Sequence, residues 1–293
     1  MMLDYDYPVY RPPSEAESLI FQITLGCSYN KCSFCDMYRS KQYYEKSLRQ
    51  IKTEILEMSN KIPKTRRIFL ADGDALNIKT ETMIEILGYL YEKFSELERV
   101  SCYAMPMNLL KKNNKELEDI HNAGLQLLYL GIESGSNVIL KKITKGATHD
   151  TIIRACTKAK KSGYELSCMV ILGLGGKKYT IDHITKTATI LNSIAPKYVG
   201  ALTLNLENGI KNEFLAKFDE EFVPIEDNDA LNELELLIKN IDTKDEIIFR
   251  ANHASNAYSI KGTFPSDKKD MLKQISWLKE HPESSRPIGF RGF

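Results

Sequence analysis

The apolar positions along the chain switch repeatedly between short continuous runs and helical spacing. Residues 125–133, "LQLLYLGIE", form an apolar run typical of a strand, whereas 80–94, "TETMIEILGYLYEKF", carry apolar side chains every three or four residues. Strand-like and helix-like segments alternate in this way as far as residue 206. The pattern predicts strands at 18–24, 67–72, 99–105, 125–133, 164–174 and 197–205. It predicts helices at 47–59, 80–94, 114–124, 136–142, 149–161 and 180–194.

Six strand–helix units in succession predict parallel strands joined by right-handed crossovers. Six units are too few to close an eight-stranded barrel, so we expect an α/β fold with a partial (βα)6 TIM-like barrel. We divide the chain into an N-terminal extension (1–17), a core (18–206) and a small α/β C-terminal extension that caps the barrel (207–293). Ligands of parallel α/β folds bind at the carboxyl ends of the strands, where we therefore expect the site.

The bulk composition limits the partners of the protein. Of its 293 residues, 43% are hydrophobic and 27% are charged, and the formal net charge is +1, which argues against a general nucleic-acid binder. The N-terminal residues lack a basic region followed by an apolar run, so we expect no signal peptide. No apolar run approaches the length that spans a bilayer. We therefore expect a cytoplasmic protein without a membrane partner.

Three of the six cysteines lie together in "GCSYNKCSFCDMY", residues 26–38, with the spacing C-x4-C-x2-C. Cytosolic thiols stay reduced, so these cysteines are expected to bind metal rather than to form disulfides. Three thiolates can hold three irons of a [4Fe–4S] cube and leave the fourth iron open. A zinc knuckle is the alternative, but structural zinc prefers four protein ligands and no histidine is nearby. The predicted ligands are Cys27, Cys32 and Cys35, and the thiols expected to be buried and inert are Cys102, Cys156 and Cys168.

The loop "CSYNKCSFC", after the first strand of a (βα)6 chain, resembles the cluster loop of the radical S-adenosylmethionine (radical SAM) superfamily. That family most often has C-x3-C-x2-C with an aromatic residue before the last cysteine. Phe34 matches the aromatic residue, so the resemblance implies that it contacts the cofactors. One extra residue separates Cys27 from Cys32. The resemblance implies an oxygen-sensitive enzyme with two cofactors, a [4Fe–4S] cluster and SAM. The reduced cluster cleaves SAM to a 5'-deoxyadenosyl radical, which abstracts hydrogen from a small or medium-sized substrate; an electron donor such as flavodoxin or ferredoxin is implied as well.

The same resemblance extends to "LADGDAL", residues 70–76, after the second strand. It stands where the family carries a "GGE" motif that binds the SAM amino group, so Asp72, Gly73 and Asp74 are predicted to contact SAM. A glycine lets the backbone approach a ligand, and carboxylates suit an ammonium group. The alternative is a plain Asp-Gly turn after a strand.

Two later segments complete the predicted cofactor contacts. In "YLGIESGS", Glu133 and Ser134 resemble the family's ribose and methionine contacts. Lys145 stands where some relatives have a basic residue that pairs with the SAM carboxylate, although it could belong to a solvated helix end. The resemblance also implies that the backbone of Ile171 and Leu172, in "VILGLGG", flanks the adenine.

The substrate is not indicated by any motif, and no catalytic hydrogen donor is identified. Polar and aromatic side chains near strand ends are candidates for substrate contacts, with packing, turns and caps as the alternative. These candidates are Tyr103, Asn108, Asn252, His253 and Asn256. The terminal segments resemble a coproporphyrinogen-oxidase-like subgroup of the superfamily. Two other functions stay open: a non-catalytic relative that binds haem or porphyrin, and a zinc-stapled α/β binding protein.

Overall fold

The computed structural model describes residues 3–206, 208–218 and 221–291. The strands are β1 (Leu19–Gln22), β2 (Thr24–Leu25), β3 (Tyr44–Glu45), β4 (Arg67–Ala71), β5 (Arg99–Ala104), β6 (Leu125–Glu133), β7 (Glu165–Leu172), β8 (Tyr198–Thr203), β9 (Ile247–Ala251) and β10 (Ile260–Phe264). The α-helices are α1 (Leu48–Lys61), α2 (Thr80–Lys93), α3 (Pro106–Lys111), α4 (Asn114–Asn122), α5 (Asn137–Lys142), α6 (His149–Lys161), α7 (Gly176–Ile194), α8 (Asn208–Ala216), α9 (Asp227–Asn240) and α10 (Lys268–Glu280). Short 3-10 helices occupy Pro13–Glu15, Ala75–Asn77, Pro282–Ser284 and Ile288–Phe290.

Eight of the strands form one sheet in the order β1-β4-β5-β6-β7-β8-β9-β10. The pairs β1–β4, β4–β5, β5–β6, β7–β8 and β8–β9 are parallel, and only β10 among the described pairs of this sheet runs antiparallel to its neighbour. The edge strands are β1 and β10, so the sheet is open. The expected α/β class with an open, partial barrel is therefore confirmed. Strands β9 and β10, which lie in the segment expected to form a C-terminal extension, continue this sheet.

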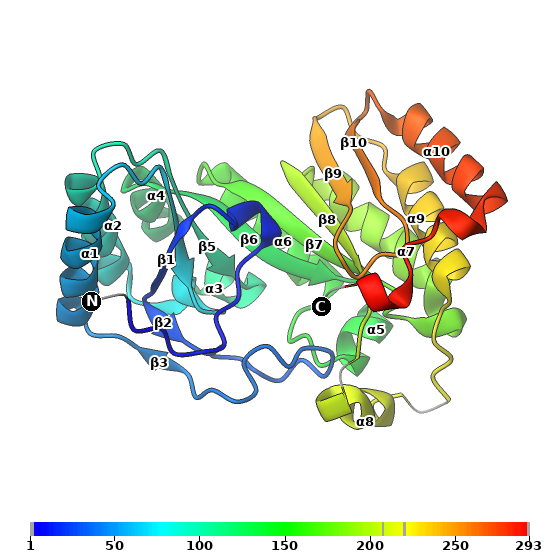
Figure 1. The fold of residues 1–293 in the computed structure, drawn as a ribbon, viewed down its shortest axis with the longest axis horizontal. Coiled ribbons are helices and arrows are strands. Elements are labelled where there is room, and N and C mark those ends of the chain that lie inside the picture. The colour runs from blue at the N-terminus through cyan, green and yellow to red at the C-terminus, as the bar shows by residue number, and fades with distance from the viewer. Residues whose placement is uncertain (1–2, 207, 219–220, 292–293) are drawn as a thin grey trace. The chain divides into compact units, whose positions relative to one another are not determined.

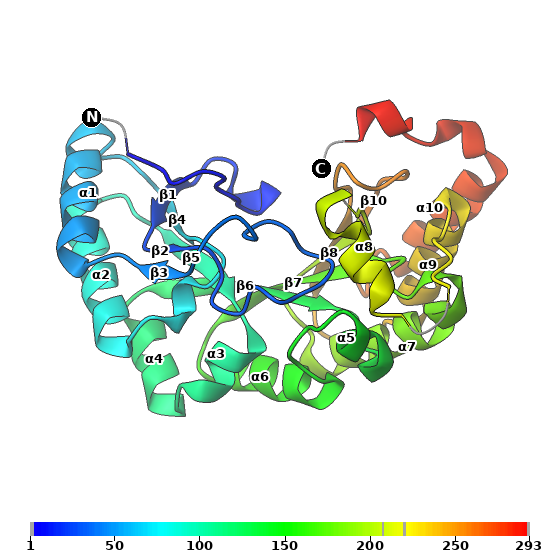
Figure 2. The same cartoon turned by 90° about the horizontal axis from the view of Figure 1, so that it is seen from below.

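The chain divides into two compact units, of which the first comprises Met1–Asn30, Cys35–Leu130 and Ala155–Leu166. Its helix α1 begins at a capping box, in which Ser47 and Gln50 satisfy each other's backbone N–H groups. Helix α1 packs on α2 (Figure 1), and α1, α2 and α4 lie on one side of the strands while the N-terminal segment lies on the other (Figure 2). In this unit, a layer of helices thus covers one side of the strands (Figure 2).

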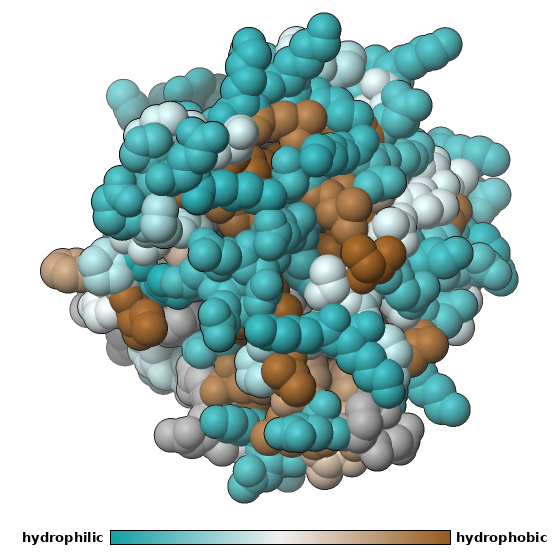
Figure 3. All heavy atoms as spheres, turned by 90° about the vertical axis from the view of Figure 1, so that its right-hand side faces the viewer, coloured by the Kyte–Doolittle hydropathy of each residue, from teal (hydrophilic) through white to brown (hydrophobic). Residues whose placement is uncertain are grey.

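The second unit comprises Lys31–Phe34, Gly131–Arg154 and Ser167–Phe293. Helix α9 packs against both α7 and α10 (Figure 1), and α10 also covers β10. The outer face of this unit is largely hydrophilic, with hydrophobic side chains in separate small areas (Figure 3). Trp277 and Ile181 are among the exposed apolar residues. Single exposed apolar side chains are normal on a protein surface.

Several elements differ from the prediction, of which α7 and α3 lie nearest to the predicted motifs. Helix α7 begins at Gly176 rather than at residue 180, because the glycine-rich segment after β7 turns directly into the helix. The short helix α3 was not predicted; it starts at Pro106, whose fixed φ suits the first helical position. Among the described residues, no helix combines the length and the apolar character that crossing a membrane requires.

Candidate cofactor site

The cysteine loop is divided between the two units. Cys27 and Cys35 belong to the first unit and Cys32 to the second, and all three side chains are partly exposed. Asn30, within the four-residue interval, adopts a φ of 43°, a left-handed conformation that asparagine tolerates better than most residues. Its side-chain Nδ2 donates a hydrogen bond to the Tyr38 carbonyl oxygen at 2.8 Å. This hydrogen bond therefore joins the four-residue interval between Cys27 and Cys32 to the end of the same loop. The remaining three cysteines are buried, as predicted.

The donor set of the loop is three cysteine thiolates, the ligand type of an iron–sulfur cluster that keeps one iron open. Within the described part of the chain, no three His, Cys, Asp or Glu side chains are grouped so as to hold one metal ion.

The central part of the cysteine loop is held by neighbours within the second unit. The backbone N–H of Ser33 donates to the carbonyl oxygen of Ile143 at 3.0 Å. Lys145 Nζ lies 5.8 Å from the centre of the Phe34 ring, within the range of a cation–π contact. The same Nζ is 2.9 Å from Glu133 Oε1. Phe34, Lys145 and Glu133, three predicted cofactor contacts, are thus connected side by side.

Asp72, in the turn after β4, is fully buried and has both carboxylate oxygens occupied. Oδ1 accepts from Gln22 Nε2 at 2.9 Å. Oδ2 accepts from the backbone N–H of Gly26 and from Lys41 Nζ, each at 3.0 Å. Lys41 is itself buried, so the two charges compensate each other inside the first unit. The contacts of Asp72 bind the start of the cysteine loop to the turn.

Asp74, two residues later, is also fully buried but lacks a cationic partner among its hydrogen bonds. Oδ2 accepts from the Ser28 hydroxyl, whereas Oδ1 has no hydrogen-bond partner in the described residues. Burial raises the pKa of Asp74 to about 7, against the opposing effects of Ser28 and Asn108. Asn108 is near enough to lower this pKa but makes no hydrogen bond to Oδ1. Asp74 is therefore equipped to accept a hydrogen bond from a donor that the described residues do not supply.

Gly73, between these two acids, occupies a position where a side chain does not fit. A Cβ at this position would lie 2.5 Å from Cε2 of Tyr38 and 3.3 Å from Cβ of Cys27. Any larger residue would push the Tyr38 ring or the cysteine loop away. The glycine thus allows the turn and the cysteine loop to meet closely.

In the second unit, the turn after β6 is contacted by a histidine that belongs to no recognised sequence motif. His183 is buried, and burial lowers its pKa to about 4, so the ring is neutral. Nε2 donates to the Ile171 carbonyl oxygen at 2.9 Å, which leaves Nδ1 to accept from the Ser134 hydroxyl at 2.8 Å. Ser134 and Ile171 are therefore connected through one imidazole. Its only sequence signal is a position on the apolar face of the predicted helix 180–194.

The turn after β7 is hydrogen-bonded to the buried Glu233 of α9. Oε2 accepts from the backbone N–H of Gly173 at 2.6 Å, and Oε1 accepts from the Thr180 hydroxyl at 2.9 Å. Gly173 has a φ of 80°, which favours glycine. Burial raises the pKa of Glu233 to about 7. The adjoining Leu172 is buried, and its carbonyl oxygen accepts a hydrogen bond from the Leu204 N–H. The side chain of Ile171, by contrast, is partly exposed.

Two of the predicted substrate residues lie in the first unit and pack into it. The Tyr103 ring meets Phe69 edge-on at 5.1 Å and Tyr129 at 6.2 Å. Burial raises the pKa of Tyr103, so its hydroxyl stays protonated. Asn108 is buried and caps α3 by accepting from the Met105 N–H at 2.8 Å.

The other three predicted substrate residues lie between β9 and β10. Asn256 is buried and ties this segment to β8, donating to the Ala201 carbonyl and accepting from the Thr203 hydroxyl. His253 Nδ1 accepts from the Ser255 N–H at 3.1 Å, which closes a local turn. Asn252 is exposed. The segment is therefore held by hydrogen bonds to β8 and by one local turn.

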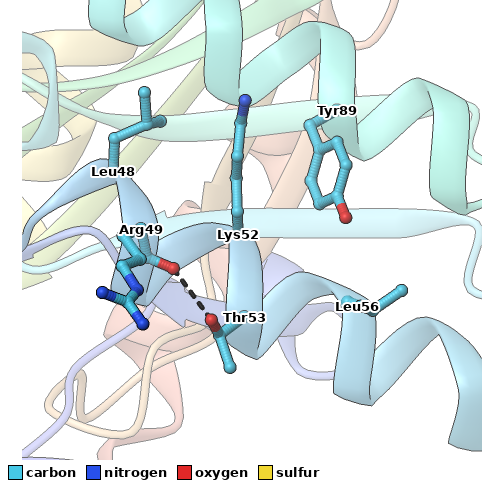
Figure 4. A pocket seen from close by; sticks show the side chains of 6 residues that line it. All are labelled: Leu48, Arg49, Lys52, Thr53, Leu56 and Tyr89. Atoms are coloured by element: carbon cyan, nitrogen blue, oxygen red, sulfur yellow. Dashed lines mark hydrogen bonds between the residues drawn. The ribbon is translucent and has the colours of Figure 1, made fainter.

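Two surface hollows lie apart from the predicted site residues. The first, of about 410 Å³, lies between α1 and α2 and is lined by Lys52, Leu56 and Tyr89 together with three neighbours (Figure 4). Lys52 is paired with Glu85, so its charge is already compensated. The second, of about 530 Å³, belongs to the other unit and is lined by Tyr179, Phe222 and six neighbours. Neither contains a predicted site residue.

A family model described as the Radical SAM superfamily matches residues 21–191, more than half of the chain. The 4'-phospho-dehydrooxetanocin synthase of Priestia megaterium is 24% identical over 201 residues, which cover 60% of this chain and 27% of that protein. The heme chaperone HemW of Buchnera aphidicola subsp. Acyrthosiphon pisum is 22% identical over 187 residues, which cover 60% of this chain and 48% of that protein. The matches thus span less than half the length of these curated relatives.

The structure of coproporphyrinogen III oxidase (HemN) from Escherichia coli has a TM-score of 0.59 at 14% identity, covering 76% of this chain and 52% of that chain. At this identity the likeness concerns the fold. The family match confirms the resemblance carried by the cysteine loop, and with it the two expected cofactors, a [4Fe–4S] cluster and SAM. The chain belongs to the Radical SAM superfamily.

Proposed function

We propose that the chain is a radical SAM enzyme whose three loop cysteines, Cys27, Cys32 and Cys35, hold a [4Fe–4S] cluster. When bound, the reduced cluster and SAM supply a 5'-deoxyadenosyl radical that abstracts hydrogen from a small or medium-sized substrate. The chain's own residues bind SAM, orient it and keep water away. An electron donor of the flavodoxin or ferredoxin type, and a cytoplasmic location, belong to the same proposal.

The observation that carries this proposal is the buried carboxylate of Asp74. Its Oδ1 has no hydrogen-bond partner among the described residues, and its pKa lies near 7 because of burial. An ammonium group placed against it would supply the missing donor and keep the carboxylate ionised. The SAM amino group is such a donor, and Ser28, directly after Cys27, already holds the other oxygen.

The remaining predicted contacts take different parts in this proposal. Lys145, beside Phe34, would provide positive charge for the SAM carboxylate, and Glu133 would then exchange its ion pair for contacts to the ligand. Ser134 is oriented by His183. Asp72 supports the turn rather than the ligand, because its oxygens are already occupied.

The test is anaerobic reconstitution with iron and sulfide, followed by dithionite and SAM. The wild-type protein should hold about four irons and four sulfides per chain. It should also form 5'-deoxyadenosine, measured by chromatography. Cys35→Ser should lose both the cluster and the product. The matched control is Cys102→Ser, which changes a buried cysteine outside the loop and should keep both. A fully loaded wild-type protein that forms no 5'-deoxyadenosine would contradict the proposal.

Haem binding is a second candidate, favoured by the similarity to two proteins named heme chaperone HemW. A haem titration of the cluster-loaded protein would show a shifted absorption band that saturates at one haem per chain. His253 is the imidazole to test first, since its Nδ1 is engaged with Ser255 while the ring is partly exposed. If the spectrum of haem is unchanged by the protein, this candidate is excluded.

A further inference from the structure

Tyr38, three residues after Cys35, is a buried tyrosine whose ring is held from several sides. Its side chain is 4% exposed. The Tyr10 ring meets it edge-on at 5.5 Å, and Lys41 Nζ lies 6.0 Å from its centre. The ring also lies against Gly73, where no Cβ could fit. Tyr38 therefore has little freedom to turn its hydroxyl toward a different partner.

The hydroxyl of Tyr38 makes no hydrogen bond to any described residue. Elsewhere in the same unit, the buried hydroxyl of Tyr129 donates to Glu15 at 2.6 Å and contacts Ser14 at 2.8 Å. A buried hydroxyl without a partner destabilises a fold, so proteins seldom retain one unless it serves a bound group. The contrast between the two tyrosines indicates that the Tyr38 hydroxyl is available to a bound group other than the described residues.

The surroundings of Tyr38 indicate which group this is. The point where a Gly73 Cβ would stand is 2.5 Å from Tyr38 Cε2, the carbon beside the one that bears the hydroxyl, and 3.3 Å from Cys27 Cβ. The Tyr38 ring thus lies beside the start of the cysteine loop, and its hydroxyl can donate a hydrogen bond to a group bound there.

We propose that Tyr38 is a positioning residue for the iron–sulfur cluster, whose hydroxyl donates a hydrogen bond to a sulfur of the bound cluster or of its cysteine ligands. This rests on the proposed function, since it requires the cluster. Hydrogen bonds to the sulfurs stabilise the more negative, reduced state and so raise the reduction potential. Tyr38 accordingly sets how easily the cluster accepts its electron.

The test compares wild type, Tyr38→Phe and Tyr10→Phe, each reconstituted anaerobically and titrated with reductant without SAM, with the reduced cluster measured by electron paramagnetic resonance. Tyr10→Phe is the matched control, because it removes a hydroxyl from the neighbouring ring. All three should carry equal iron and sulfide. Tyr38→Phe should have a lower reduction potential than wild type, and Tyr10→Phe should not. An unchanged or raised potential in Tyr38→Phe overturns the proposal, as does an equal shift in Tyr10→Phe.

Thermal stability gives a second measurement that does not depend on redox chemistry. Without the cluster, Tyr38→Phe should melt at a higher temperature than wild type, because it removes an unsatisfied buried hydroxyl. With the cluster, this advantage should disappear or reverse, because the hydroxyl then has a partner. An equal difference in both forms, or a Tyr38→Phe protein that fails to fold, overturns the proposal. A wild-type protein that assembles no cluster would instead refute the proposed function itself.

Discussion

The turns after β4 and β7 each rest on a buried carboxylate whose pKa is raised to about 7, yet the two acids differ in their partners. Glu233, beneath the β7 turn, gives one oxygen to Gly173 and the other to Thr180. Asp74, in the β4 turn, gives one oxygen to Ser28 and has no partner for Oδ1 among the described residues. Burial accounts for both raised pKa values. The difference in hydrogen bonding is what separates a structural acid from one suited to a ligand.

Asp72 sharpens this contrast from within the β4 turn. It is as deeply buried as Asp74, but Lys41, Gln22 and Gly26 occupy its oxygens. A carboxylate in this state has no hydrogen-bonding capacity to spare for a ligand's ammonium group without losing an internal contact. We therefore expect a different response when each of the three carboxylates is replaced by its neutral amide.

The largest effect is expected from Asp72→Asn. The change leaves Lys41 buried without its counter-charge, so the free energy of unfolding should fall by about 3–5 kcal/mol. Urea denaturation of the protein without cofactors measures this loss. Glu85→Gln is the control, because its ion pair with Lys52 is largely exposed and should contribute less than about 1 kcal/mol. Equal stability of the two variants would show that Asp72 is not an essential support.

The next effect concerns Glu233→Gln and depends on pH. A carboxyl group whose pKa rises from 4.5 to about 7 on folding destabilises the native state as the pH rises through this interval. At about 1.4 kcal/mol per pKa unit, wild type should lose up to about 3 kcal/mol relative to Glu233→Gln between pH 4.5 and pH 8. Urea denaturation at several pH values tests this. Parallel stability profiles would mean that Glu233 ionises normally in the fold.

The smallest expected free-energy change belongs to Asp74→Asn, and it appears in binding. Loss of one hydrogen bond between charged groups should weaken SAM affinity by about 10- to 100-fold. Fold stability should not decrease. Titration calorimetry with the cluster-loaded protein measures the affinity, and Glu85→Gln again serves as the control. Undiminished affinity in Asp74→Asn would remove the main support for the proposed SAM contact.

Most of the fold could be predicted because strands such as β4 and β6 are nearly continuous apolar runs buried on both faces. The prediction 125–133 coincides with β6, and 149–161 coincides with α6. Strand β10 was missed because "IKGTF" contains a lysine, a glycine and a threonine, and only its first and last residues are buried. An edge strand paired on one side needs no continuous apolar run.

The site could be predicted only in part, because sequence reveals residue types but not which hydrogen bonds are filled. The Asp-Gly-Asp turn was located from its place after a strand, but Asp72 and Asp74 look alike in sequence. What distinguishes them is Lys41, Gln22 and Gly26, at least 31 residues away. His183 and Glu233 were missed for the same reason, since each contacts its turn from a helix at least 49 residues further along the chain.

The bond from Asn30 to the Tyr38 carbonyl has a consequence for how sequence patterns are searched. A motif search that demands three residues between the first two cysteines passes over this chain, although the loop has the means to absorb a fourth. Asn30 adopts a left-handed conformation and hydrogen-bonds to Tyr38 at the other end of the loop. An interval held in this way can contain one more residue while the cysteines on either side of it keep their places. A useful query would allow either length and ask instead for a residue able to make that turn.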